Sequence, residues 1–378
     1  MHCFKTGNKH YWFNDLSKCR NFKETTIEFL LPGMIVVRAP LRISFVGGGT
    51  DLPDFYFRHP GRVLSTTIDK YVYIVINRTP LIDKVSARYS LSETVDTPDE
   101  LQHTRIKHAL IDFGIAKNIE IGSFASLPAK TGLGSSSSFS VALLKGLHSY
   151  QKKNIDKTGV AEAACRLEID LLGEPIGKQD QYAAAFGGFN VFQFNPDDSV
   201  DVRPVFLDYK MRRMIEDHLL LFYTGIARPV SSVLFEQKAN IGGKFETLKS
   251  MADSVPEFTE RLTRGDIQGL GSMLHDGWTM KKTLASNISS APIDALYGAG
   301  MDAGAFGGKV LGAGGGGCMM FFAPPERKKV VRNTISEAAR SMGLSEFKEI
   351  PVEFVQSSAE VLLNADNHRA RGASSEIV

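Results

Sequence analysis

From Met34 onward, the hydrophobic and polar positions of the chain form patterns typical of strands and helices in turn. Residues 35–46, IVVRAPLRISFV, are rich in β-branched side chains, which are typical of a strand. Residues 136–150 repeat apolar side chains at helical spacing, with Phe139 and Leu143 on one side, and predict a helix. The same criteria predict strands at 71–79, 118–125, 218–225 and 352–355, and helices at 160–172, 232–240, 245–250, 266–281, 293–299 and 326–342.

These elements predict an α+β protein with two lobes. The first lobe is expected to run from residue 34 to 205 and the second from 206 to 360. Residues 1–33 show no strand or helix period, so we expect an N-terminal extension that precedes a natural start at Met34. Residues 361–378 are expected to be a frayed tail, as chain ends often are.

Composition narrows the class of protein. The chain has 378 residues, 43% of them hydrophobic and 23% charged, which fits a globular enzyme with a sizeable core. Lys and Arg number 44 and Asp and Glu 42, a net charge of +2, which disfavours a nucleic-acid-binding protein. No apolar run reaches the roughly 18 residues that a membrane-spanning helix needs. Cys3, Cys19, Cys165 and Cys318 form no C-x-x-C pair, so reduced thiols and a cytoplasmic protein are expected.

Two of three glycine-rich segments predict close backbone packing. In residues 38–52, RAPLRISFVGGGTDL, three glycines let the backbone approach a ligand or another loop closely. A tight turn with Asp51 capping the next helix explains this segment equally well. Residues 312–318, GAGGGGC, match G-x-G-x-x-G, but a strand-like CMMFFA follows where a dinucleotide-binding motif needs a helix. We therefore expect a hairpin turn that packs against another loop.

The remaining glycine-rich segment predicts phosphate binding. In residues 127–139, LPAKTGLGSSSSF, a glycine loop and four serines lead directly into the predicted helix. Such a loop points backbone N–H groups and the positive end of the helix dipole at an anion. One serine would suffice to cap the helix, so four favour an anion site over simple capping. The segment is not a Walker loop, because G-x-x-x-x-G-K-[ST] is absent from the chain.

Phosphoryl transfer also needs acidic groups for a metal and often a base for the attacking hydroxyl. In the predicted helix 160–172, Glu168 and Asp170 each lie about 80° from the apolar stripe, on opposite sides, so geometry does not choose between them. Asp180 lies in GKQDQYAAAFGG, where a polar patch runs into small apolar residues. A partly buried carboxylate and an ordinary helix-start Asp are both compatible with that pattern.

Taken together and in this order, the segments resemble the GHMP kinase superfamily, over about Ile35 to Val355. The resemblance implies a two-lobed α+β fold. Its N-terminal lobe would be like domain 2 of ribosomal protein S5 and would bind ATP, and its C-terminal lobe would be ferredoxin-like. The active site would lie between the lobes.

The resemblance also implies roles for single residues. Asp180 would be the catalytic base, oriented by Arg42, and Ser136 and Glu168 would bind Mg²⁺, which settles the choice against Asp170 by family pattern. The implied ATP-binding residues are Lys130, Gly132, Leu133, Gly134, Ser135, Ser136, Ser137 and Ser138, and the implied substrate-binding residues are Gly47, Gly48, Gly49, Thr50, Asp51, Gly314 and Gly315.

The first motif departs from that of galactokinases, which carry Glu-His where this chain has Gly48 and Gly49. The lost side chains leave room for a larger or anionic substrate. The motif is most similar to that of D-glycero-D-manno-heptose 7-phosphate kinases, which implies phosphorylation of the C1 hydroxyl to the 1,7-bisphosphate for nucleotide-heptose synthesis.

L-fucokinase or galactokinase activity is the alternative, and an inactive sugar sensor is disfavoured because Arg42, Ser136, Glu168 and Asp180 are all present. The partners implied are thus ATP and a small sugar phosphate, with no nucleic acid and no membrane. Which residue holds the substrate phosphate stays open among Arg58, Arg62, Arg88 and Lys130.

Overall fold

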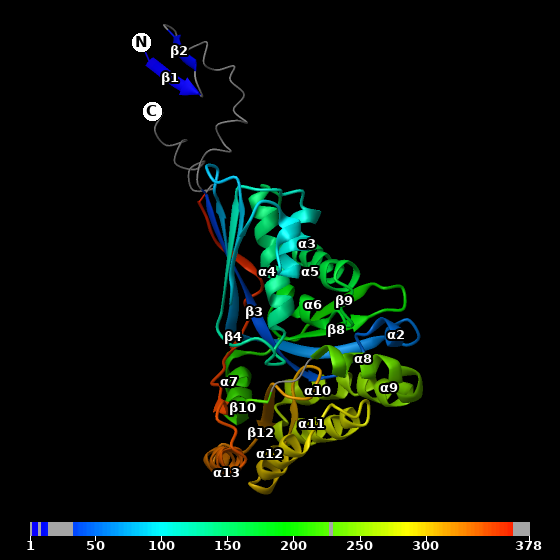
Figure 1. Ribbon diagram of the computed structural model, residues 1–378. Helices are drawn as coiled ribbons and strands as arrows, with labels where there is room; N and C mark the ends of the chain where they lie inside the picture. The colour runs from blue at the N-terminus through cyan, green and yellow to red at the C-terminus, as the bar shows by residue number, and fades with distance from the viewer. Residues whose placement is uncertain (1, 7–8, 14–32, 227–229, 366–378) are drawn as a thin grey trace.

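The computed structural model describes residues 2–6, 9–13, 33–226 and 230–365, and this part of the chain forms two lobes, one above the other in Figure 1. The upper lobe is built on a nine-stranded sheet whose longest strands are β3 (Met34–Val46) and β4 (Gly61–Arg78). The other strands of this sheet are β5 (Val85–Arg88), β6 (Ser92–Val95), β7 (Ile119–Ala125), β8 (Asn190–Phe194), β9 (Val200–Pro204), β14 (Phe354–Val355) and β15 (Glu360–Asn364).

Strand β3 changes its surroundings halfway along. Up to Arg38 its positions alternate in burial, and from Ala39 to Val46 every residue is buried. The Phe45 ring lies 5.8 Å from the ring of Phe258 and 6.2 Å from that of Phe322, both in the lower lobe. The second half of β3 is therefore covered on both faces, because it runs into the junction of the two lobes.

Helices cover one face of the upper sheet, and α4 (Ser135–Tyr150) packs on β3 and β4 (Figure 1). This confirms the predicted helix 136–150. The predicted helix 160–172 instead divides into α5 (Lys157–Cys165) and a π-helical stretch, η3 (Arg166–Leu171). The remaining helices of this lobe are α2 (Pro53–Tyr56), η2 (Pro98–Glu100), α3 (Thr104–Asp112) and α6 (Gln179–Phe186).

The π-helical stretch changes the end of the expected apolar stripe, whose earlier members Val160, Ala164 and Leu167 are buried as expected. A π turn is wider than an α turn, so side chains no longer follow the spacing of about 100° per residue. Glu168 is completely buried, whereas Leu171, which the stripe had placed inside, is 36% exposed. Asp170 is exposed as well.

The lower lobe holds a four-stranded antiparallel sheet in the order β11–β12–β10–β13. Its strands are β10 (Leu219–Tyr223), β11 (Gly307–Val310), β12 (Cys318–Phe322) and β13 (Lys348–Glu349), and β10 and β12 lie within segments predicted to form strands. Its helices are α7 (Tyr209–His218), α8 (Val230–Asn240), η4 (Ile241–Lys244), α9 (Phe245–Asp253), α10 (Val255–Arg264), α11 (Ile267–Lys282), α12 (Ala291–Asp302) and α13 (Lys328–Ser341).

The C-terminal segment returns to the upper lobe. β14 pairs with β4, and β15 pairs with β3. The prediction of a frayed tail from residue 361 is therefore wrong for residues 361–364. The predicted end of the second lobe at residue 360 also differs from the structure, because β14 and β15 belong to the sheet of the upper lobe. β15 covers an edge that would otherwise leave the N–H and C=O groups of β3 unpaired. Residues 366–378 of the predicted tail lie outside the described residues.

The N-terminal segment contains two strands that the sequence pattern did not predict. β1 (His2–Thr6) and β2 (Lys9–Phe13) pair antiparallel with each other. Residues 14–32 lie outside the described residues, and the extension's role stays a prediction. None of the described helices is long and apolar enough to cross a membrane. Cys165 and Cys318 are buried and unbridged, as expected of reduced thiols.

A glycine hairpin joins the two lobes. Residues between β11 and β12 in the lower lobe lie against the loop before α4 in the upper lobe. A Cβ placed on Gly312 would lie 2.7 Å from the Cα of Gly132, and Cys318 N–H donates to the Thr131 carbonyl at 2.8 Å. This confirms the prediction of a hairpin turn packed against another loop.

Replacing Gly312 by Ala tests this contact. Gly312 has a φ of +68° and no room for a Cβ, whereas Gly343 has a φ of +71° and open space around it. Gly343→Ala should cost about 1 kcal/mol of unfolding free energy from backbone strain alone. Gly312→Ala should cost at least about 1 kcal/mol more, since a backbone must also move. Urea unfolding of both variants measures the difference, and equal losses would contradict the packing argument.

Candidate active site

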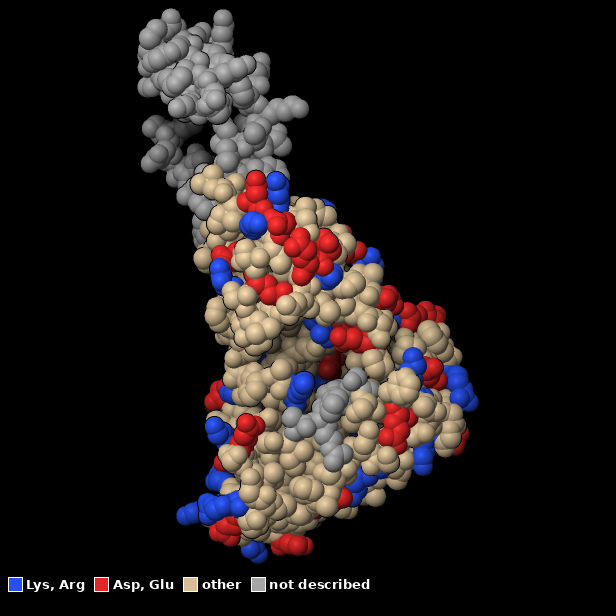
Figure 2. Space-filling model, in the orientation of Figure 1, with Lys and Arg blue, Asp and Glu red and all other residues tan. Residues whose placement is uncertain are grey.

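A cavity of about 660 Å³ lies between the lobes and is lined by residues of both. Figure 2 shows this hollow midway along the molecule, with acidic and basic side chains at its edges. The upper lobe contributes the ends of β3 and β7 and the starts of α4 and α6. The lower lobe contributes residues of α8, α11 and β11 and the first residues of the glycine hairpin.

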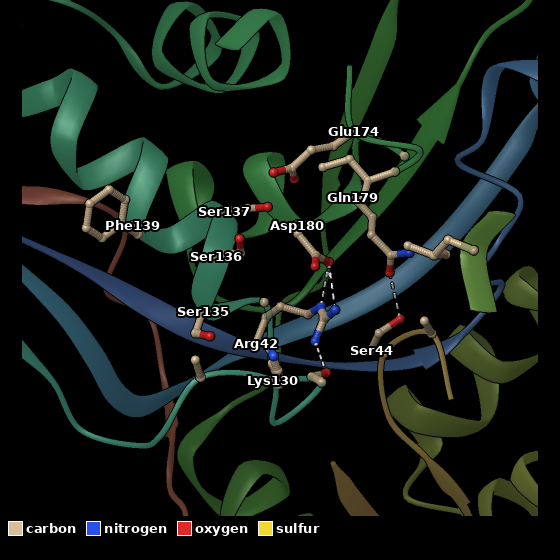
Figure 3. Close-up of a pocket in the computed structure, with 18 of the residues that line it drawn as sticks. Arg42, Ser44, Lys130, Ser135, Ser136, Ser137, Phe139, Glu174, Gln179 and Asp180 are labelled. Atoms are coloured by element: carbon tan, nitrogen blue, oxygen red, sulfur yellow. Dashed lines mark hydrogen bonds and ion pairs between the residues drawn. The ribbon is translucent and has the colours of Figure 1, made fainter. Parts of the chain in front are cut away.

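An ion pair stands at the centre of the cavity wall. The Arg42 guanidinium donates from Nε and Nη2 to Asp180 Oδ1, at 2.8 Å and 2.7 Å, and from Nη1 to the Gly132 carbonyl at 2.7 Å (Figure 3). Arg42 is 3% exposed and Asp180 is 26% exposed. No described donor bonds Asp180 Oδ2, which lies 3.5 Å from the Cβ position of Gly134. The structure thus brings the two predicted catalytic residues together, with one carboxylate oxygen facing the predicted phosphate loop.

The predicted phosphate loop lies in the cavity wall only in part. Gly134 occupies the N-cap position of α4 with a φ of +75°, so the helix starts beside the Arg42–Asp180 pair. Leu133 and Ser138 are buried behind the wall, where Leu133 O accepts from Arg42 N–H and the Ser138 hydroxyl donates to Pro40 O. The residues of this loop that line the cavity are Lys130, Gly132, Gly134, Ser135, Ser136 and Ser137.

Glu168 does not reach the cavity. Its Oε1 accepts from Arg105 Nε at 3.1 Å and from the Ser140 hydroxyl at 2.7 Å. Its Oε2 accepts from the Ser137 hydroxyl at 2.8 Å and from Gln181 Nε2 at 2.6 Å. Four protein donors therefore satisfy this buried carboxylate, and they tie the start of α4 to η3 and α6.

Glu168→Gln should destabilise the protein even without magnesium. The change removes the charge partner of Arg105, and breaking a buried ion pair costs about 3–5 kcal/mol. Because Arg105 keeps Glu174 at 2.7 Å, we expect about 2–3 kcal/mol here. Chemical unfolding in EDTA measures this loss of unfolding free energy, with exposed Glu162→Gln on α5 as the matched control. Equal stability of the two variants would mean that Glu168 has no structural role.

The first glycine segment divides into residues that build the turn and residues that face the cavity. A Cβ on Gly47 would lie 1.8 Å from the Arg62 carbonyl, and the buried Thr50 hydroxyl donates to the Gly47 carbonyl. Neither faces the cavity, so their predicted contact with substrate is not supported by their position. Gly48, Gly49 and Asp51 do line it.

Asp51 is more constrained than predicted. Its carboxylate accepts from Gly49 N–H at 3.1 Å, from Gln179 N–H at 3.2 Å and from Gln179 Nε2 at 2.9 Å. Burial raises its pKa, and the nearby Asp180 raises it further. Asp51 therefore shapes the glycine turn and holds Gln179, and only its remaining acceptor capacity is left for a ligand.

The third glycine segment lies mostly away from the cavity. Gly314 packs on Ile288, and Gly315 N–H donates to the Ile288 carbonyl at 2.7 Å. These two glycines anchor the hairpin within the lower lobe and do not line the cavity, so their predicted contact with substrate is not supported by their position. Their neighbours Gly312 and Ala313 line the cavity.

Sequence reasoning missed several residues of the cavity wall. Glu174 and Arg105 form an ion pair there, and burial raises the pKa of Glu174. Gln179 accepts from the Ser44 hydroxyl (Figure 3) and donates from Nε2 to Asp51. Gln179 directly precedes Asp180 in the sequence, and this position was the signal that could have identified it as a residue of the site. Others are His103, Phe124, Phe139, Gln237, Lys281 and Lys309.

Comparison with known proteins agrees with this fold. Residues 102–188 match the GHMP kinase N-terminal domain, and residues 258–341 match the GHMP kinase C-terminal domain. The chain therefore contains both the N-terminal and the C-terminal GHMP kinase domain and has the two-domain GHMP kinase fold. It is a sugar kinase, an ATP-dependent phosphotransferase.

Among individual relatives, the D-glycero-alpha-D-manno-heptose 7-phosphate kinase of Campylobacter jejuni is 27% identical over 293 residues, 74% of this chain and 86% of the relative. The L-fucokinase/L-fucose-1-P guanylyltransferase of Bacteroides fragilis is 26% identical over 308 residues, 68% of this chain and 31% of the relative.

Among solved structures, a D-glycero-D-manno-heptose 1-phosphate kinase from Bacteroides thetaiotaomicron has a TM-score of 0.70 and 26% identity, covering 88% of this chain and 99% of that one.

Proposed function

We propose that the protein transfers the γ-phosphoryl group of ATP to the C1 hydroxyl of D-glycero-D-manno-heptose 7-phosphate, yielding the 1,7-bisphosphate for nucleotide-heptose synthesis. The Arg42–Asp180 pair beside the start of α4 is the observation that carries the chemistry. Similarity to the Campylobacter jejuni heptose 7-phosphate kinase supports the acceptor. The glycine pair of the first motif supports it too, because a Cβ on Gly48 would meet nothing closer than 3.9 Å.

Asp180 would act as the general base. Its Oδ2 accepts the proton of the C1 hydroxyl as that oxygen attacks phosphorus, while Oδ1 stays bonded to Arg42. Arg42 keeps the carboxylate in one orientation and places positive charge beside the reacting groups. A positioned base of this kind contributes about 10²–10⁴ in rate.

The start of α4 would hold the phosphates of ATP. Gly134 leads directly into the helix, so backbone N–H groups and the positive end of the helix dipole face the cavity there. Lys130, with a φ of +65°, and the Ser135 and Ser136 side chains lie in the same wall (Figure 3). Beyond them the cavity is lined by Phe124 and Leu127, an apolar environment that suits a purine ring.

Magnesium belongs to the proposal through the Ser136 hydroxyl and Glu168. Hydroxyl and carboxylate oxygens are ligands that Mg²⁺ accepts, and the ion would neutralise phosphate charge when bound. Glu168 fits this role only if it gives up a present partner, since Ser137, next to Ser136, already bonds its Oε2. The exposed Ser136 hydroxyl faces the cavity without such a bond in the described chain.

Ser136→Ala tests the magnesium role. We expect the magnesium concentration for half-maximal turnover to rise about tenfold, because one oxygen ligand is lost. Ser135→Ala is the matched control, and the two are compared in magnesium titrations at saturating ATP. Identical titration curves for wild type and Ser136→Ala would remove this residue from the metal site.

An ADP-release assay with a sugar panel tests the proposed reaction. The panel holds D-glycero-D-manno-heptose 7-phosphate, D-mannose, D-galactose, L-fucose and mevalonate. We expect turnover on the heptose phosphate, and Asp180→Asn should lower it by at least about 10²-fold while ATP still binds. Exposed Asp170→Asn is the control and should keep wild-type turnover.

Other outcomes are decisive as well. Turnover on L-fucose alone would favour the activity named for the Bacteroides fragilis relative and overturn the heptose assignment. An Asp180→Asn variant with unchanged turnover would remove Asp180 as the base.

A further inference from the structure

Two lysines of the lower lobe are buried in the cavity wall. Lys281 lies on α11 and is 4% exposed, and Lys309 lies on β11 and is 6% exposed. Lys281 Nζ donates to the Gly312 carbonyl, and Lys309 Nζ donates to the Ser44 and Phe45 carbonyls at 3.1 Å and 2.9 Å. Neither lysine forms an ion pair with a carboxylate of the described chain.

Such burial is costly unless a negative group arrives. Burial, and after it the positive charge of Arg42, lowers the pKa of Lys281 to about 8. Burial also lowers the pKa of Lys309, helped by Lys281 and Arg42, so these three basic groups are close enough to repel one another. Asp180 and Asp51 attract Lys281 but are already held by Arg42 and Gln179. An incoming anion would favour the charged form of both lysines.

Lys309 lies beside the glycine turn of the first motif. The carbonyls that Lys309 contacts immediately precede the Gly47–Gly49 turn in the sequence. On the same side, Gly48 has open space, with the Ser44 hydroxyl the nearest atom to its Cβ position. A galactokinase-type side chain at residue 48 would occupy that space, so its absence leaves room for a group that is bulkier than a hydroxyl.

Gln237 on α8 is an independent sign of a ligand at this place. It is 3% exposed, and its Nε2 has no hydrogen-bond partner in the described chain. This amide nitrogen lies 2.4 Å from the Cβ position of Gly49, and the residue lines the same cavity. A buried donor without an acceptor costs stability, which a bound oxygen atom would restore.

The side chains that the sequence left open are less suited to this role. Arg58 lies over the Phe245 ring at 4.1 Å. Arg62 bonds Asp253 and Gln193. Arg88 pairs with Glu120, and none of these three lines the cavity. Lys130 does line it, but at the phosphate loop.

We propose that Lys281, Lys309 and Gln237 form an acceptor-phosphate subsite, which binds the phosphate that the sugar already carries before the transfer. The subsite rests on the proposed kinase function and specifies its substrate class, a phosphorylated sugar as opposed to a neutral one. A phosphate monoester supplies three acceptor oxygens and up to two negative charges, which match two amino groups and one amide donor.

Kinetics with matched substrates test the subsite. The pair is D-glycero-D-manno-heptose with and without its 7-phosphate, and kcat/KM is measured for each together with KM for ATP. Lys309→Met should lower kcat/KM for the phosphorylated sugar about 10–100-fold, the worth of a charge-assisted hydrogen bond. The same substitution should change kcat/KM for the unphosphorylated sugar, and KM for ATP, by less than about threefold.

A second test variant and a control variant keep the subsite testable if Lys309→Met folds poorly. Gln237→Leu removes a donor that has no protein partner, and should lower kcat/KM for the phosphorylated sugar about 3–10-fold with a normal melting temperature. Lys282→Met, next to Lys281 but 36% exposed and paired with Asp294, is the control and should match wild type.

The failures of the subsite and of the proposed function are distinguishable. Equal wild-type kcat/KM for both sugars, or a rise in KM for ATP alone in Lys309→Met, overturns the subsite while the kinase reaction stands. If the heptose phosphate is not turned over, wild type and Lys309→Met are compared for D-mannose 6-phosphate and inorganic phosphate binding by calorimetry. Weaker binding to Lys309→Met supports the subsite without the heptose assignment, and equal or undetectable binding overturns it.

Discussion

The Arg42 guanidinium is the group on which the rest of the site depends. It is nearly inaccessible to solvent, and it bonds at once to a carboxylate at the start of α6 and to a carbonyl of the phosphate loop. Its own backbone N–H donates to the carbonyl of Leu133. Because the fork of a guanidinium is planar and rigid, these bonds hold Asp180 and the loop in one relative position. The proposed base and the proposed anion-binding loop, fixed in this way, would need no rearrangement during the reaction.

The long buried half of β3 explains how Arg42 can sit there. From Ala39 to Val46 the strand is covered by helices of its own lobe and by the lower lobe, so its side chains have little freedom. The glycine hairpin completes the arrangement, since Gly132 and Gly312 meet backbone to backbone. The two lobes are therefore joined at the wall of the cavity itself, and the site's geometry depends on both.

The two lobes contribute charge in different ways. Three carboxylates of the upper lobe are held by protein donors, with Asp180 Oδ1 on Arg42, Asp51 on Gln179 and Glu168 on four donors, while Asp180 Oδ2 has no described donor. The lower lobe contributes Lys281 and Lys309, whose hydrogen bonds within the described chain go to carbonyl oxygens. Buried charges are tolerated when they are paired, so the arrangement is completed by anionic ligands. The phosphates of a kinase reaction are ligands of that kind.

The sequence by itself determined the features that depend on local pattern: the strand at 35–46, the helix after the four serines and the glycine hairpin. Arg42 and Asp180 became candidates through the motifs that the chain shares with a known family. The sequence did not separate Glu168 from Asp170 by geometry, because both lie equally far from the apolar stripe at α-helical spacing. The π-helical stretch in which Glu168 is buried was not visible in the sequence pattern. Sequence reasoning also missed β15, Gln237, Lys281 and Lys309. Only the tertiary structure decided these, since strand pairing and the neighbours of a buried polar side chain depend on segments far away in the chain. Lys309 and Ser44 are 265 positions apart, and no local pattern marks their contact.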